Sequence, residues 1–232
     1  MKAIFVSAAI AALSLVSAGQ AGAGTYSVPG SSNPFLAGMP GGSTCCAGDS
    51  APAESPIYAG AVTGGMSLTF TGVTGGVSYA GGVPTDGPNG NAGLLVDTLA
   101  YEGVSTINNI AGFTNAPVDA LVGVFLNGGL PTLNVAPGVL DFSSPTLTPL
   151  LQQIFFIGDG SLGAITVPTG ATRLYLGAVD GFGWYNNTGA INVTVNTLSG
   201  VPEPAGWTLM LAGFGGLGMA IRARRRQAVA AA

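Results

Sequence analysis

The chain has 232 residues, of which 39 are Gly and 15 are Pro, and its charged residues amount to only 7%. An ordinary soluble domain carries about 25% charged residues, yet the 47% hydrophobic content is enough for a folded core. The sequence contains no His, and Arg173 is the only base between residues 25 and 200, where nine acids lie. This balance excludes His-dependent catalysis and a surface that binds nucleic acid.

Residues 1–23 have the pattern of a secretory signal peptide. Lys2 is a minimal basic region, and Ala3–Val16 is an apolar run. The small residues Ala21-Gly22-Ala23 then predict cleavage before Gly24. A first transmembrane helix is the alternative, but the run is short, and the Gly- and Ala-rich stretch that follows it favours cleavage.

Residues 24–55 are rich in Gly, Pro, Ser and Ala and show no apolar periodicity, which predicts a mobile arm or linker. The only two cysteines, Cys45 and Cys46, lie in this segment. Adjacent cysteines can form a disulfide in an oxidising compartment, within the chain with strain or between chains. A metal site on two Cys without a nearby His is a weaker alternative. The simplest interpretation is a cysteine pair without chemistry of its own.

From Ile57 onward, short apolar runs alternate with glycine-rich turn signals. The runs are rich in Val, Ile, Leu, Thr and aromatic residues, which favours strands over helices. Strands are expected at Met66–Thr71, Gly75–Tyr79, Leu94–Leu99, Ala120–Leu126, Ile154–Ile157, Arg173–Val179 and Ile191–Thr197. About seven short strands in roughly 140 residues predict an all-β domain, an antiparallel β-sandwich over residues 56–198.

The residue types in the middle of the chain argue against an enzyme. Neither His nor Lys is there to activate a Ser or Cys nucleophile, and no glycine loop followed by Lys indicates a phosphate-binding loop. A glycosidase needs two carboxylates that face each other across a cleft, and no spacing among the nine acids indicates such a pair. We therefore expect a protein that binds rather than one that catalyses.

The segment Arg173–Val195 combines a strand end with oxygen-bearing side chains. An apolar strand ends at Asp180, a loop of alternating Gly and aromatic residues follows, and Asn186-Asn187 precede a further strand. A carboxylate and two amide oxygens on one loop are hard ligands of the kind that calcium takes. The alternative is a plain β-hairpin in which the Asn residues form the turn and Asp180 caps a strand end.

The C-terminal residues 199–232 contain a proline-flanked tripeptide, an apolar run and a basic cluster. Pro202, Glu203 and Pro204 come first, and residues 207–221 form an apolar run that is predicted to be a transmembrane segment. The basic cluster consists of Arg222, Arg224, Arg225 and Arg226. This order resembles the PEP-CTERM sorting tail of exported proteins from Gram-negative bacteria that make exopolysaccharide. An ordinary C-terminal anchor that is never cleaved is the alternative.

The sorting-tail resemblance implies a destination. The chain would be exported through the inner membrane and anchored there transiently. An exosortase would then recognise and remove the tail, and the mature protein would reach the cell surface or the extracellular matrix.

Residues 56–197, and above all residues 167–195, also resemble the PA-IL-like family, the calcium-dependent galactophilic lectins of bacteria. The family ends in a strand, an Asp, a short loop with an aromatic residue, Asn-Asn-Ser-Gly and a final strand. Here Asp180, Gly181–Tyr185 and Asn186-Asn187-Thr188-Gly189 stand in that order. Ser78-Tyr79 resembles the family's loop that offers a tyrosine backbone oxygen. The resemblance implies a galactose-binding, jelly-roll-like sandwich.

The lectin resemblance also implies two overlapping sites. The calcium ligands would be the side chains of Asp180, Asn186 and Asn187, the backbone oxygen of Tyr79 and a further backbone oxygen at Gly183 or Trp184. Carbohydrate would bind through two hydroxyls on the calcium, close to the residues Asp180, Asn186, Trp184 and Tyr185. The two aromatic residues would either stack on the sugar or pack on the sheet.

This chain departs from the family pattern at two points. The stretch from Asp180 to Asn186 is one residue shorter than the family's loop, and a galactose contact by His is impossible. The sequence therefore predicts calcium-dependent binding of a carbohydrate such as exopolysaccharide, without naming the sugar. The alternative is a structural or adhesive matrix protein that keeps the sandwich and has lost the sugar site.

Overall fold

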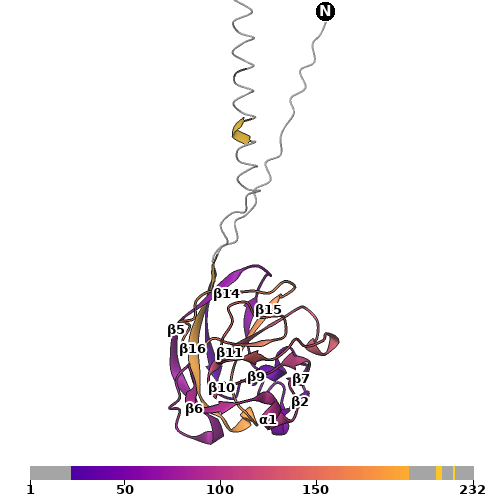
Figure 1. Cartoon of the computed structure of the whole chain (residues 1–232). Coiled ribbons are helices and arrows are strands. Elements are labelled where there is room, and N and C mark those ends of the chain that lie inside the picture. The colour runs from indigo at the N-terminus through magenta and orange to yellow at the C-terminus, as the bar shows by residue number, and fades with distance from the viewer. Residues whose placement is uncertain (1–21, 199–212, 216–221, 223–232) are drawn as a thin grey trace, which may run out of the picture. The chain divides into compact units, whose positions relative to one another are not determined.

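Two four-stranded antiparallel sheets form the fold in the computed structural model, which describes residues 22–198, 213–215 and 222 (Figure 1). The first sheet has the strand order β1 (Ala23–Pro29), β16 (Thr188–Leu198), β5 (Ser67–Ser78) and β14 (Ile165–Thr166). The second has the order β13 (Ile154–Phe156), β11 (Leu121–Leu126), β15 (Arg173–Ala178) and β4 (Ile57–Ala61). The expectation of an all-β, antiparallel fold is confirmed.

The main core lies between these two sheets. In β16, the alternating residues Ile191, Val193 and Val195 are buried, as expected for a strand with one face on the core. They belong to one cluster with residues from both sheets, among them Phe125 and Phe155, whose rings stack at 4.8 Å. The two sheets therefore form a sandwich around a shared apolar interior.

The second sheet is buried on its other face as well. All six residues of β11 are buried, so this strand shows no alternation of apolar and polar residues. Its second face belongs to another cluster, which includes Phe35, Phe113 and Trp184 from the connecting segments. A strand covered on both faces needs a continuous apolar run, which explains the composition of residues 120–126.

The strand predictions hold where the apolar runs are long. The runs at 120–126, 154–157, 173–179 and 191–197 correspond to β11, β13, β15 and β16. The two runs at 66–71 and 75–79 form a single strand, β5, because glycines at positive φ, Gly72 and Gly75, carry it through the irregular pairing with β16. The run at 94–99 is displaced, since β6 covers Asn91–Val96 and a short helix, α1 (Thr98–Glu102), follows.

Residues 24–55, predicted as a linker, instead belong to the folded domain. They contain most of β1, a 3-10 turn η1 (Pro34–Leu36), and a small hairpin of β2 (Thr44–Cys45), η2 (Cys46–Gly48) and β3 (Asp49–Ser50). Val28, Phe35 and Leu36 are fully buried. The Gly and Pro residues of this segment serve tight turns, and its core contacts are too widely spaced to produce a period.

Short elements connect the two sheets. The strand β6 pairs with β10 (Ala116–Val118), β7 (Thr106–Ile107) pairs with β8 (Ile110–Ala111), and β9 (Phe113–Thr114) pairs in parallel with β12 (Leu140–Asp141). The 3-10 turns are η3 (Tyr79–Gly81), η4 (Pro131–Leu133) and η5 (Trp184–Asn186). Of these, η3 follows β5 and η5 follows β15.

The predicted targeting segments lie largely outside the described residues. This holds for residues 1–21 and for Pro202-Glu203-Pro204. Of the predicted span 207–221 only residues 213–215 are described, and of the basic cluster only Arg222. No helix in the described part of the chain is long and apolar enough to cross a membrane. Ala23, placed by the sequence at the end of the signal peptide, lies in β1 opposite Asn196.

The Phe125–Phe155 stack allows a direct test of the two-sheet core. We expect Phe155→Ala to lower the free energy of unfolding by about 3–5 kcal/mol, because a fully buried ring is replaced by a cavity. Val83→Ala, at a side chain that is 78% exposed, is expected to change it by less than about 0.5 kcal/mol. Urea unfolding of the full chain measures both, and equal effects would contradict this core.

Candidate functional site

Acidic residues gather at one end of the sandwich, where β5 and β15 end and β16 begins. Ser78, the last residue of β5, pairs with Thr188, the first residue of β16. The turns that follow β5 and β15, η3 and η5, lie against each other, and a Cβ on Gly81 would lie 3.4 Å from the backbone oxygen of Asn186. Five acids surround this end of the fold, namely Asp49, Asp86, Glu102, Asp119 and Asp180.

Asp119 is a fully buried acid close to the end of β5. Its side chain is 0% exposed, and its Oδ2 accepts a hydrogen bond of 3.1 Å from the Tyr79 amide. Its other oxygen, Oδ1, is buried and has no hydrogen-bond partner. Burial, with a smaller contribution from the neighbouring Asp86 carboxyl, raises the pKa of Asp119 to about 7. In the absence of a cation, burial and the neighbouring carboxyl therefore favour the protonated form of Asp119.

Asp180 and Asn187 are brought together as the sequence predicts. Asp180 is 8% exposed, and its Oδ1 accepts hydrogen bonds from the backbone amides of Gly181 and Phe182. Burial raises the pKa of Asp180, although a hydrogen bond from the Asn187 side chain offsets part of this shift. The Asn187 amide nitrogen donates to the Gly30 carbonyl at 3.2 Å, while its Oδ1 is buried without a donor.

Within residues 22–198, no basic side chain compensates these carboxylates. Arg173 is the only base between residues 25 and 200. Its guanidinium donates to the carbonyls of Asn127, at 2.7 Å, and Gly129, beyond the opposite end of β11 and β15. A buried carboxylate without a cation is unfavourable, so this end of the fold is suited to a bound positive ion.

Asp119 reaches the site because β11 and β15 are neighbours. Leu121 pairs with Ala178, and the Asp119 amide donates to the Val179 carbonyl at 2.8 Å. Asp119 therefore lies beside the residue that precedes Asp180. Sequence analysis missed both Asp119 and Asp86. The only signal for Asp119 is a charged residue directly before a continuous apolar run, and nothing around Asp86 distinguishes it from a turn residue.

The other predicted ligands lie on the two turns. Tyr79 begins η3, and its backbone is tied to Asp119 through its amide. Asn186 is exposed at the end of η5. The Trp184 carbonyl accepts a hydrogen bond of 3.0 Å from the Asn187 amide, and Gly183 adopts a positive φ of 86° that lets the loop turn. The loop is thus closed on itself.

Trp184 is a core residue, so of the two alternatives for its side chain the structure shows packing in the interior. Its side chain is 0% exposed, and its indole nitrogen donates to the Ala178 carbonyl at 2.8 Å. The ring makes an edge contact with Phe35 at 5.9 Å. The neighbouring Tyr185, in contrast, is 60% exposed. The short loop holds one aromatic side chain inside and leaves the next one in solvent.

The hairpin formed by β2, η2 and β3 contains a second cluster of ligand atoms. The sulfurs of Cys45 and Cys46 and a carboxylate oxygen of Asp49 all lie within 4.8 Å of one another, so this group could hold a metal ion. The Asp49 carboxylate also accepts hydrogen bonds from the backbone amides of Trp184, at 2.9 Å, and Tyr185, at 3.0 Å. The hairpin is therefore attached directly to η5.

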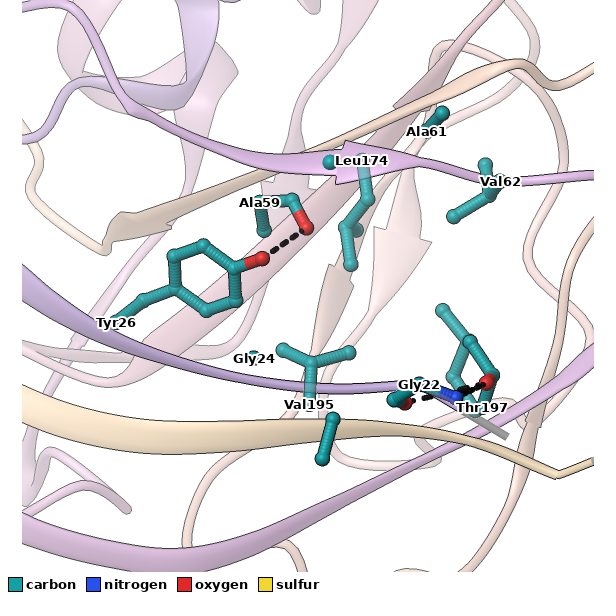
Figure 2. A pocket seen from close by; sticks show the side chains of 12 residues that line it. Gly22, Gly24, Tyr26, Ala59, Ala61, Val62, Leu174, Val195 and Thr197 are labelled. Carbon is teal, nitrogen blue, oxygen red and sulfur yellow. Dashed lines mark hydrogen bonds between the residues drawn. The ribbon is translucent and has the colours of Figure 1, made fainter. Parts of the chain in front are cut away.

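An apolar pocket of about 230 Å³ lies at the opposite end of β16, between the edges of β1 and β4 (Figure 2). Figure 2 shows Tyr26 donating from its hydroxyl to the Ala59 carbonyl, a bond of 2.7 Å, and Gly22 bonded to Thr197. The segment from Thr188 to Thr197 spans about 30 Å as an extended strand. The pocket is thus remote from the acids, and its lining contains no carboxylate or base.

Comparison with known proteins adds no family assignment. Neither protein-family models nor curated proteins match this chain.

The buried acids predict an unusual pH dependence of stability in the absence of calcium. Native Asp119 keeps its proton up to a pH of about 7, whereas an unfolded Asp loses it near pH 4. Between these values the native state binds more protons, so stability falls as pH rises from about 4 to 7. We expect urea unfolding in chelator to show this fall for the wild type and a smaller one for Asp119→Asn.

Asp141→Asn serves as the control for that series. Asp141 is exposed, and hydrogen bonds from Ser143 and Asn115 lower its pKa. Its replacement is expected to leave the fall in stability above pH 4 unchanged. The same pH dependence in Asp119→Asn and in the wild type would show that Asp119 does not carry the effect.

Proposed function

We propose that this chain is an exported, calcium-dependent carbohydrate-binding protein of the bacterial cell surface or exopolysaccharide matrix. One observation carries the proposal: Asp119 and Asn187 each have a buried oxygen without a hydrogen-bond donor, in a carboxylate cluster without a base. Buried acceptors are nearly always satisfied in folded proteins, so two unsatisfied ones in one place indicate a missing positive partner.

The donor set favours calcium over other divalent ions. The groups around β5, β15 and β16 are carboxylates, an amide oxygen and backbone carbonyls, all of them hard oxygen donors. Calcium accepts six to eight such ligands in flexible geometry, whereas magnesium requires a near-ideal octahedron. We assign Asp119, Asp180 and Asn187 as side-chain ligands and the Tyr79 carbonyl as a backbone ligand. Asp86 and Asn186 are the next oxygen-bearing residues.

The bound ion would supply a positive centre on which two adjacent sugar hydroxyls can be placed. The chain's own residues would then orient the sugar. Carboxylate oxygens of Asp180 can accept hydrogen bonds from those hydroxyls, and the burial of the cluster keeps competing water away. Asn186 is exposed at the rim, where its amide can bond a hydroxyl further out.

Exposed aromatic residues around the acids support a carbohydrate as the ligand. Tyr185 and Phe182 are 60% and 59% exposed, and both lie on the loop that follows Asp180. Tyr101 is packed against this loop, since a Cβ on Gly181 would lie 2.8 Å from its ring. Aromatic side chains can stack against the apolar face of a sugar ring, whereas charged ligands of a metal ion cannot make this contact.

The destination is proposed from the chain ends. The signal-peptide pattern of residues 1–23 supports export. The sequence order of the motifs in residues 201–226 supports transient anchoring in the inner membrane and release of the tail by an exosortase. A neutral, matrix-forming polysaccharide suits a protein whose domain carries a single base, because such a surface repels polyanions. A structural or adhesive matrix protein without sugar binding is the competing function.

The calcium assignment predicts that Asp180→Ala lowers calcium affinity at least tenfold, equivalent to about 1.4 kcal/mol. Titration calorimetry of the full chain measures this directly. Calcium is also expected to raise the melting temperature of the wild type relative to chelator, because a ligand bound only by the folded state stabilises it. Asp141→Ala, which removes an exposed acid, is expected to leave affinity unchanged. Wild-type affinity in Asp180→Ala would refute the assignment.

The carbohydrate assignment predicts different outcomes for two exposed tyrosines. Tyr185→Ala is expected to weaken binding to glycans by about fivefold to tenfold while calcium affinity stays the same, since stacking contributes roughly 1 kcal/mol. Tyr58→Ala is the control, because Tyr58 is 50% exposed on β4 and packs against Tyr175. A glycan array in calcium, repeated in chelator, provides the measurement. Calcium binding without any glycan signal would favour the structural matrix role.

A further inference from the structure

The hairpin of residues 44–50 places three different ligand atoms close together. Cys45 in β2 lies directly opposite Asp49 in β3, and the turn between them is tight. Cys46 and Ala47 adopt positive φ values of 48° and 58°, a backbone conformation that residues other than Gly rarely adopt without a structural reason. The result is that both thiol sulfurs and an Asp49 oxygen lie within 4.8 Å of one another.

The carboxylate of this hairpin is fixed by its surroundings. Asp49 and Asn33 are both 0% exposed. The Asn33 amide nitrogen donates to the Asp49 Oδ2 at 2.9 Å and to the Cys45 sulfur at 3.2 Å. Together with the bonds from the Trp184 and Tyr185 amides to Asp49, four donated hydrogen bonds hold the Asp49 carboxylate and the Cys45 sulfur in position. A metal ligand requires this kind of support from its neighbours.

A fourth group faces the same hairpin. The Oε1 atom of Glu102, at the end of α1, is buried and accepts no hydrogen bond. Burial, followed by the negative charges of Asp49 and Asp180, raises the pKa of Glu102. No basic side chain in this part of the sequence is available to pair with Glu102.

We propose that Cys45, Cys46 and Asp49 form a site for a thiophilic divalent metal ion of the zinc class. Two sulfurs bound to one tetrahedral zinc lie roughly 3.8 Å apart, a spacing that fits within the 4.8 Å cluster. Thiolate sulfur selects zinc, cadmium or copper(I) and is avoided by calcium. This site is distinct from the proposed calcium site.

Binding at this site requires proton release. Each thiol gives its proton to solvent as its sulfur bonds to the metal, so the two sulfurs release two protons and no electrons are transferred. Affinity should therefore rise with pH. Cys45, which is half-buried, is the open side through which the ion enters.

The test titrates cobalt(II) into the full chain, kept reduced with a phosphine, and follows thiolate-to-metal charge-transfer absorption. We expect saturation near one equivalent and displacement of the cobalt by zinc. Cys45→Ser is expected to weaken cobalt binding at least tenfold and to reduce the charge-transfer band. Asp141→Asn, at an exposed carboxylate outside the hairpin, is expected to bind like the wild type.

A crossed design separates this site from the calcium site. Cys45→Ser should lose zinc binding and keep its calcium response, whereas Asp180→Ala should lose calcium binding and keep its zinc response. If Cys45→Ser does not fold, protection of the wild-type thiols from alkylation by zinc provides an independent readout. Loss of both responses in Asp180→Ala alone would show one shared site and would overturn the proposal.

Two further results would also overturn it. One is the absence of charge-transfer absorption on addition of cobalt to the reduced, folded chain. The other is a disulfide between Cys45 and Cys46 that the phosphine does not open, shown by a mass two hydrogens below that of the dithiol. Protection of both thiols by one equivalent of zinc, reversed by chelator, would support the site.

Discussion

The burial of β11 on both faces is the constraint on which the rest of the structure depends. A strand with no solvent-facing side chain must lie beside strands that are themselves anchored, and here those are β13 and β15. The pairing of Leu121 with Ala178 then determines which residues meet beyond the strand ends. Asp119 and Asp180 come together there because they flank the two most buried strands of the sheet.

That position explains why the pKa values of Asp119 and Asp180 are raised and why a cation would stabilise this end of the fold. Extending an apolar strand pair by two carboxylates moves negative charge into a region with few polar groups, which disfavours the ionised form. Protonation relieves this unfavourable charge at low pH, and a bound divalent ion would relieve it at neutral pH. Arg173, the only base between residues 25 and 200, hydrogen-bonds the loop at residues 127–129 instead. No other side chain in that range can supply the positive charge that the carboxylates lack.

Sequence reasoning succeeded for features that repeat locally. Long apolar runs identified β11, β15 and β16, and the Asp180–Asn187 pair was visible because both residues lie on one loop. It failed where a contact joins distant segments. Asp119 is buried by its pairing partners, the segment 24–55 enters the core through isolated residues such as Phe35, and Trp184 turns inward because Asp49 holds its amide. None of these leaves a periodic pattern.

Asp49 connects the two proposed metal sites through a single side chain. One carboxylate is within reach of the two thiols and accepts hydrogen bonds from the amides of Trp184 and Tyr185, so it orders the loop that carries Asn186 and Asn187. Sulfur and oxygen donors prefer different ions, which lets both sites form without competition. A metal bound at the hairpin would lower the negative charge beside η5 and hold its backbone. Asp49 already holds this loop without a metal, so the two sites would adjoin one ordered loop and share no ligand.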